Sequence, residues 1–180
     1  MRVRILALFV VAALSTVGAA AAGKSRRAAT AVEPRLPALP DRGVVHSARC
    51  PIPRRFRAAF VGAAHETGQQ LAMLVAVAEV ESRFEPTARS AADARGLLQV
   101  LPATGASLDL DVDDPESNVL AGALYLKQLL DRYQSTDAAF AAYNAGPTAV
   151  DHAGGEAPSV ETLTYVANVQ ARWRALSGCR

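Results

Sequence analysis

Two glutamates stand two residues apart where an apolar run ends, in the segment AEVESRFEP of residues 78–86. A carboxyl group held where water is scarce keeps its proton near neutral pH and can serve as a general acid. Positions two apart on an α-helix point roughly 200° away from each other, so Glu79 and Glu81 cannot share one site. Glu85 stands before Pro86, which disfavours helical geometry there. We therefore expect one glutamate to work alone, against the simpler interpretation that all three are solvated charges at a helix end.

Other candidate metal-binding motifs in the sequence lack a required residue at the required position. The segment HETGQ at His65 has Gln69 where the second ligand of a metalloprotease HExxH motif would stand. The aspartate-rich segment 109–116 lacks the glycine and the glutamate that a calcium loop needs at fixed positions. There is also no CxxC pair or Cys/His cluster of the kind that holds zinc. We therefore expect neither a metal site nor another cofactor.

The elements that position this carboxyl group are expected to be helices. Apolar periodicity, caps and breakers predict five of them, near residues 53–67, 70–83, 115–133, 136–143 and 161–176. The second is apolar on nearly every side and carries the glutamate pair. Residues 144–147, Asn-Ala-Gly-Pro, are a strong stop signal, and residues 152–159, HAGGEAPS, predict a loop. No stretch alternates as a strand does, so the predicted fold class is all-α.

Four sequence blocks resemble a known family. The first, VAEVESRFEPTARSAADARGLLQVLPATG, is similar to the opening motif of the soluble lytic transglycosylase catalytic domain. The blocks DDPESNVLAGALYLKQLL, AAYNAGPTAV and ETLTYVANV resemble its second, third and last motifs, in the same order. Together they lie within residues 71–169. The resemblance implies a lysozyme-like helical fold with a groove for the glycan strands of bacterial peptidoglycan, working without a cofactor.

Within this resemblance Glu81 matches the single catalytic acid/base of the family, because Ser82 follows it. In the family this glutamate protonates the oxygen that links N-acetylmuramic acid to N-acetylglucosamine. It then takes the proton of the muramic acid C6 hydroxyl, which attacks C1 and leaves a 1,6-anhydro end without adding water. The resemblance also implies substrate-binding roles for five side chains, those of Ser90, Gln99, Tyr143, Asn144 and Tyr165.

Two residues depart from the family pattern. Leu98 replaces the usual methionine of Gly-Leu-Met-Gln, with a similar volume. Asp93 stands where the family often has glycine, and it offers a second carboxylate. Two alternatives to a lytic transglycosylase therefore stay open. One is a goose-type lysozyme, a hydrolase of the same fold, and the other is a cell-wall-binding or secretion-assembly module with little catalysis.

The N-terminal segment has the layout of an export signal. Residues 1–22 combine a basic start, an apolar stretch over 5–17 and small residues at 20–22, which is typical of a cleaved signal peptide. An uncleaved segment, the alternative, would be the chain's contact with a membrane. Residues 23–52 are rich in proline and arginine and predict a linker, which leaves 53–180 as the catalytic domain. We expect a monomer that is periplasmic, held in the cell envelope or extracellular.

Charge and cysteine usage agree with export. Residues 23–50 hold six basic and two acidic side chains, whereas 51–180 hold eleven basic and fifteen acidic ones. The folded part therefore predicts no basic face for nucleic acid. Cys50 and Cys179 stand at the two edges of the predicted domain, and in an exported protein such a pair suggests a disulfide. Two free thiols are the alternative.

Overall fold

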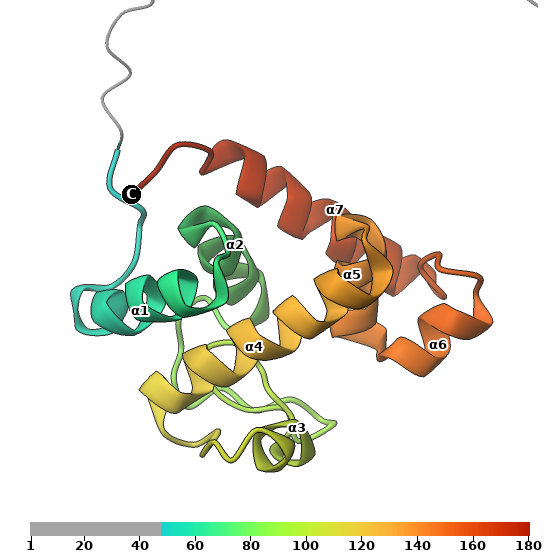
Figure 1. The fold of residues 1–180 in the computed structure, drawn as a ribbon, viewed down its shortest axis with the longest axis horizontal. Coiled ribbons are helices and arrows are strands. Elements are labelled where there is room, and N and C mark those ends of the chain that lie inside the picture. The colour runs from blue at the N-terminus through green and yellow to red at the C-terminus, as the bar shows by residue number, and fades with distance from the viewer. Residues whose placement is uncertain (1–47) are drawn as a thin grey trace, which may run out of the picture. The chain divides into compact units, whose positions relative to one another are not determined.

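Helices make up the regular structure of residues 48–180, the part of the chain that the computed structural model describes (Figure 1). The predicted signal peptide and residues 23–47 of the predicted linker lie outside the described residues. Within 48–180 no strand forms, and two isolated bridges, Arg89 with Arg95 and Arg95 with Val100, are the only β-type pairing. The predicted all-α class is confirmed.

The helix that carries the glutamate pair lies at the centre of the core. This helix, α2 (Leu71–Glu81), has seven consecutive buried residues, Ala72 to Ala78, as expected for a helix that is apolar all round. It packs against α1 (Arg57–Thr67) and against α7 (Val160–Ala175). A single 3₁₀ turn, Arg54–Phe56, leads into α1, and Gly68 ends α1 at a φ of 69°. A glycine is suited to that left-handed position because it has no Cβ to clash.

Two helices at the front of Figure 1 each start with a side-chain cap. Asp114 caps α4 (Pro115–Tyr133) by accepting a hydrogen bond from the Ser117 amide, and Pro115 occupies the first turn. Ser135 caps α5 (Thr136–Ala145) in the same way, through the Ala138 amide. α4 packs against both α1 and α5, and α5 continues the core toward α7. A short helix, α3 (Pro102–Ser107), packs against α4.

The structure differs from the prediction in two places: it contains a helix that was not predicted, and α2 is shorter than predicted. The stop signal at residues 144–147 does end α5, since Gly146 has a φ of 82°, but Pro147 then opens another helix, α6 (Pro147–His152). Proline fits the first turn of a helix because the amide it lacks would have no partner there. Helix α2 ends at Glu81 instead of continuing to residue 83, because Arg83 and Phe84 both take left-handed φ angles, 51° and 63°.

The two ends of the described chain lie side by side. Cys50 and Cys179 form a disulfide, and the Arg180 amide and carbonyl pair with Ala48 and Cys50. Cys50 and Ile52 are buried, so the packed part of the chain includes residues just ahead of Pro53. Among residues 48–180, none of the helices combines the length and the apolar character needed to cross a membrane.

Candidate active site

Glu81, the last residue of α2, lies where the buried core meets a cavity. The Tyr165 hydroxyl, from α7, donates a hydrogen bond of 2.6 Å to Glu81 Oε1. Burial raises the pKa of Glu81 to about 7, because the surroundings solvate its charged form poorly. The hydrogen bond from Tyr165 acts in the opposite direction and lowers this pKa. The carboxyl group is therefore half protonated near neutral pH, with one oxygen held by a neighbouring helix.

Glu79, two residues earlier, faces a different part of the molecule. The Arg172 guanidinium on α7 binds both of its carboxylate oxygens, with one Nη2–Oε1 distance of 2.8 Å. Such a two-point contact between an arginine and a carboxylate is among the stronger charge-assisted pairs in proteins. Glu79 is absent from the lining of the cavity beside Glu81. One glutamate of the pair is thus committed to an ion pair, and the other is free to exchange a proton with a bound molecule.

Tyr143, on α5, lies in the wall of the same cavity. Its hydroxyl donates a hydrogen bond of 2.8 Å to the Leu98 carbonyl. Burial raises the pKa of Tyr143 well above its usual value, and the nearby charge of Glu81 adds to this effect. The side chain therefore stays a neutral phenol. A Cβ at Gly122 on α4 would lie 2.6 Å from Leu98 and 2.9 Å from the Tyr143 hydroxyl, so this glycine permits the close packing of both.

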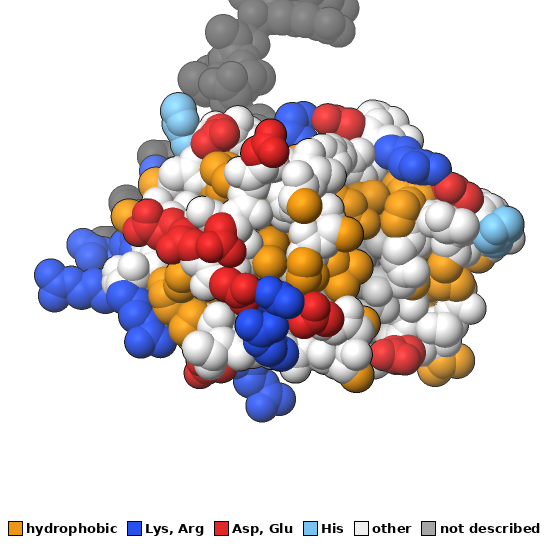
Figure 2. All heavy atoms as spheres, turned by 90° about the horizontal axis from the view of Figure 1, so that it is seen from below, with side chains coloured by type: hydrophobic (Ala, Val, Ile, Leu, Met, Phe, Trp, Pro, Cys, Tyr) orange, Lys and Arg blue, Asp and Glu red, His pale blue; other side chains and the backbone are white. Residues whose placement is uncertain are grey.

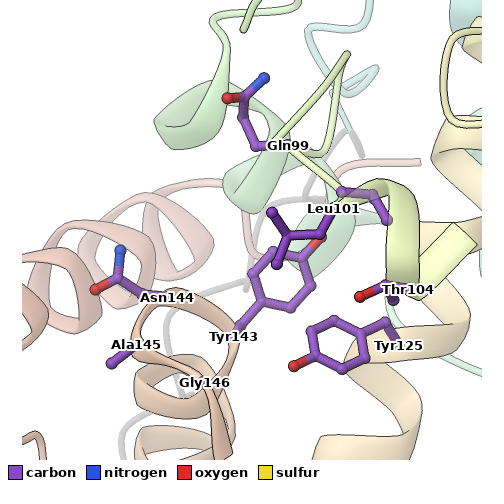
Figure 3. A pocket seen from close by; sticks show the side chains of 9 residues that line it. Gln99, Leu101, Thr104, Tyr125, Tyr143, Asn144, Ala145 and Gly146 are labelled. Carbon is purple, nitrogen blue, oxygen red and sulfur yellow. The ribbon is translucent and has the colours of Figure 1, made fainter. Parts of the chain in front are cut away.

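The cavity beside Glu81 has a volume of about 340 Å³. It is lined by Glu81, Ser90, Ala91, Ala92, Ala94, Gln99, Leu101, Tyr143, Asn144 and Glu161. A second cavity of about 190 Å³ adjoins it and shares Gln99, Leu101, Tyr143 and Asn144. In Figure 3, which looks into this second cavity, the Tyr143 ring lies between Leu101 and Tyr125. The two cavities form a groove that continues past the residues they share.

The structure brings most of the predicted site residues together. Glu81, Ser90, Gln99, Tyr143 and Asn144 all line the first cavity. Tyr165 does not line this cavity; its hydroxyl, on α7, binds the Glu81 carboxyl group instead. Burial raises the pKa of Tyr165 well above its usual value, so Tyr165 also remains a hydrogen-bond donor.

Two of these side chains also hold the loop that carries them. Ser90 Oγ accepts hydrogen bonds from the amides of Ala92 and Ala94, at 3.2 and 3.1 Å. Gln99 Nε2 donates to the carbonyls of Ala88 and Gly96, at 3.1 and 3.0 Å. Their positions in the groove are therefore set by the local backbone, which limits how far either side chain can move toward a bound molecule.

Asp93, the second carboxylate suggested by the sequence, points elsewhere. It bonds to Arg89 and Arg95, and it is absent from the cavity lining. The hydrogen bond from Arg95 holds the pKa of Asp93 below its usual value, so the group remains ionised. The second carboxylate of the cavity is Glu161, on the first turn of α7. Glu161 was not among the predicted site residues. Its position four residues before Tyr165, which places the two side chains on one side of the helix, is a signal that could have identified it.

No group of histidine, cysteine, aspartate and glutamate side chains within residues 48–180 is arranged to hold a metal ion. The titratable side chains that line the groove are the carboxyl groups of Glu81 and Glu161 and the phenols of Tyr125 and Tyr143, and Tyr165 binds Glu81.

The sequence profile of one protein family, described as the Transglycosylase SLT domain, matches residues 59–166. The chain belongs to this family. The match runs from α1 into α7 and therefore includes both glutamates of α2 and every residue of the groove.

Curated relatives of this SLT domain are transglycosylases. A transglycosylase of Enterobacteria phage PRD1 is 39% identical over 75 residues, which cover 41% of this chain and 28% of the phage protein. The membrane-bound lytic murein transglycosylase F of Maricaulis maris is 35% identical over 100 residues, covering 51% of this chain and 22% of the relative. The chain thus spans between a fifth and a third of the length of these relatives.

A solved structure supports the same fold. An inactive variant of the lytic transglycosylase Slt from Pseudomonas aeruginosa, in which glutamine replaces a glutamate, superimposes with a TM-score of 0.59. The two sequences are 27% identical, and the match covers 73% of this chain and 25% of that one. The lysozyme-like SLT fold expected from the four sequence blocks is therefore confirmed.

Proposed function

We propose that this SLT domain is a peptidoglycan lytic transglycosylase, which cleaves the bond between N-acetylmuramic acid and N-acetylglucosamine without water. The observation that carries the proposal is the state of Glu81. Its pKa of about 7 and its position in a groove suit a group that must first donate a proton and then accept one. The names of the relatives, lytic murein transglycosylases among them, support the same substrate.

In the first step Glu81 donates its proton to the glycosidic oxygen, and the bond from that oxygen to C1 of the muramic acid breaks. The electron pair of this bond leaves with the N-acetylglucosamine hydroxyl. Positive charge develops at C1, where the 2-acetamido group of the substrate can stabilise it. Glu81 is left ionised, and the hydrogen bond from Tyr165 stabilises the new charge at Oε1.

In the second step the C6 hydroxyl of the same muramic acid forms a bond to C1 and gives its proton to Glu81. The 1,6-anhydro ring closes, and Glu81 returns to its protonated form for the next cycle. One C–O bond breaks and one forms, so no water is consumed. This route uses a single carboxyl group, whereas hydrolytic glycosidases commonly use two.

Hydrolysis is the second candidate function, because Glu161 lines the same cavity as Glu81. In an inverting or retaining hydrolase a second carboxylate activates water or attacks C1. Glu161 would fill that role in a goose-type lysozyme mechanism. The cavity also contains Tyr143 and Asn144, which can position a water molecule or a sugar hydroxyl equally well.

Mass spectrometry of the fragments released from purified peptidoglycan separates the two functions. Anhydro ends are lighter than reducing ends by the mass of one water. We expect anhydro ends from the native domain and from Glu161→Gln, and none from Glu81→Gln. Reducing ends that disappear in Glu161→Gln would overturn the transglycosylase in favour of a hydrolase. Binding without any fragments from the native domain would favour a wall-binding or assembly module instead.

We also propose that the domain works outside the cytoplasm, where its substrate lies. The disulfide between Cys50 and Cys179 supports this location, because such bonds persist in oxidising compartments. Fractionation of cells that express the full chain tests it. We expect the domain outside the cytoplasmic fraction, with residues 1–22 removed by a signal peptidase.

A further inference from the structure

The wall of the groove opposite α5 is a loop rather than a helix. Residues 88–101 form it and contribute Ser90, Ala91, Ala92, Ala94, Gln99 and Leu101 to the cavity lining. The loop folds back on itself through hydrogen bonds between Ser90 and Ala94 and between Arg95 and Val100. Asp93 and Gln99 have left-handed φ angles of 63° and 46°. Such conformations cost free energy in residues other than glycine, so surrounding contacts must hold them.

Asp93 is held by a group of charged side chains that do not line the cavity beside Glu81. Arg89 bonds to Asp93 at 3.4 Å and to Asp113 at 3.0 Å, and Arg95 bonds to the same two aspartates at 2.9 and 2.5 Å. Arg89, Arg95 and Asp113 line a separate small cavity of about 200 Å³. On the face of the domain drawn in Figure 2, acidic and basic side chains likewise lie directly next to one another. We call Arg89, Asp93, Arg95 and Asp113 the charge cluster.

Asp113 differs from the other three members, because it belongs to the connection between α3 and α4. Its carboxylate reaches both arginines, one on each side of the loop tip that carries Ser90 to Ala94. The Arg95 side chain is 23% exposed, whereas the other three members of the cluster are 49–57% exposed. Partial burial and two partners for each charge strengthen such networks.

We propose that Asp113 is a positioning residue for substrate binding: through Arg89 and Arg95 it fixes the loop tip that forms one wall of the groove. The inference rests on the proposed function, since the wall matters only if a glycan strand occupies the groove. Asp113 contacts neither Glu81 nor Tyr165, which are held by α2 and α7. The cluster therefore affects how tightly a strand binds, and it leaves the proton transfers unchanged.

The base of the loop has an independent anchor. Asn118 on α4 is fully buried, accepts a hydrogen bond from the Leu98 amide at 2.9 Å, and donates to the Arg95 and Val112 carbonyls. A buried polar group with all of these partners holds the backbone whether or not the charges outside it are paired. Loss of the Asp113 charge therefore loosens the tip of the loop without unfolding its base.

The test compares Asp113→Asn with Asp131→Asn, which removes an equivalent charge from an exposed pair with Lys127 on α4. Initial rates of fragment release from peptidoglycan are measured over a range of substrate concentrations. We expect Asp113→Asn to raise KM about threefold to tenfold, from the loss of its ion pairs with Arg89 and Arg95, with kcat within about twofold. The alkaline fall in kcat/KM, which reports Glu81, stays at the same pH. Asp131→Asn has the kinetics of the native domain.

Two further measurements separate positioning from general stability. Because salt screens exposed charges, the KM values of the native domain and Asp113→Asn should converge as sodium chloride is raised. Asp113→Glu, which restores the charge, should recover part of the lost affinity. An unchanged KM in Asp113→Asn, or a fall in kcat at constant KM, would overturn the inference. If the native domain releases no fragments at all, the proposed function fails instead, so the two failures are distinguishable.

Discussion

Glu79 and Glu81 lie in the last turn of one helix, yet the two sides of that helix give them different chemistry. Both lie near the C-terminal end of α2. Glu79 faces a region with a guanidinium that binds both of its oxygens. Glu81 faces a groove, with burial that raises its pKa and one phenol as its partner. Local sequence alone therefore does not determine which glutamate faces the groove and which is paired, because both partners come from α7.

The largest expected difference between the two glutamates is in catalysis. Glu81→Gln keeps the shape of the side chain but cannot donate and accept the proton, so fragment release should fall by about 10²–10⁴-fold. Glu79→Gln, the matched control two residues away, should retain activity within about threefold. Release of soluble fragments from peptidoglycan measures both. Equal losses in the two variants would mean that the assignment of Glu81 as the acid is wrong.

The second difference is in how stability depends on pH. The pKa of Glu81 rises from 4.5 in the unfolded chain to about 7 in the fold, so ionisation favours unfolding. Its contribution is fully favourable below pH 4.5 and is lost as pH rises to 7, by about 3 kcal/mol in total. Glu81→Gln has no such loss. Urea unfolding at pH 4.5 and pH 8 should therefore show the variant gaining stability relative to the native domain at the higher pH.

This stability comparison has its own control and its own contrary result. Glu79→Gln leaves the carboxyl group of Glu81 in place, so the relative gain at pH 8 should be absent from that variant. If native and Glu81→Gln proteins respond identically to pH, the carboxyl group of Glu81 is as well solvated in the fold as in the unfolded chain.

The third difference concerns Tyr165, whose hydrogen bond lowers the pKa of Glu81. Tyr165→Phe removes this bond, so the pKa of Glu81 should rise further, and the alkaline fall in kcat/KM should move to higher pH. We expect kcat itself to fall about threefold to tenfold, because the charge left on Glu81 after proton donation loses its donor. A pH–rate profile measures both effects. An alkaline limb that stays in place would show that Tyr165 does not interact with the catalytic proton.

The helical fold could be predicted from the sequence because the residues that start, end and bury its helices act locally. The cap at Asp114, the stop at Gly68 and the unbroken apolar run of α2 each act within a turn or two of the chain. One error arose where a distant contact is involved. Phe84 takes a left-handed conformation and its ring packs 5.7 Å from that of Phe60, which ends α2 two residues earlier than predicted.

The sequence predicted which residues form the site better than it predicted the contacts between them. The four blocks pointed to Glu81, Gln99 and Tyr143, which do line one cavity. Nothing in the local sequence reveals that the partner of Glu81 lies 84 residues away, or that the partner of Glu79 lies 93 residues away. Glu161 was missed for the same reason, because its place in the groove depends on how α7 packs against α2.

The smallest expected effect is the stability lost when the ion pair on the far side of α2 is broken. The Glu79 and Arg172 side chains are 31% and 36% exposed, so water already solvates part of each charge. Glu79→Gln should therefore lower the free energy of unfolding by about 0.5–1 kcal/mol at pH 7, measured by urea unfolding, and this loss should shrink in high salt.

A loss of several kcal/mol would mean that the ion pair between Glu79 and Arg172 sets the register of α7 on α2. In that case Tyr165 would shift relative to Glu81, and the two sides of the helix would not be independent. Measuring the alkaline limb of kcat/KM in Glu79→Gln decides this, since independence requires that the limb stay where it is in the native domain.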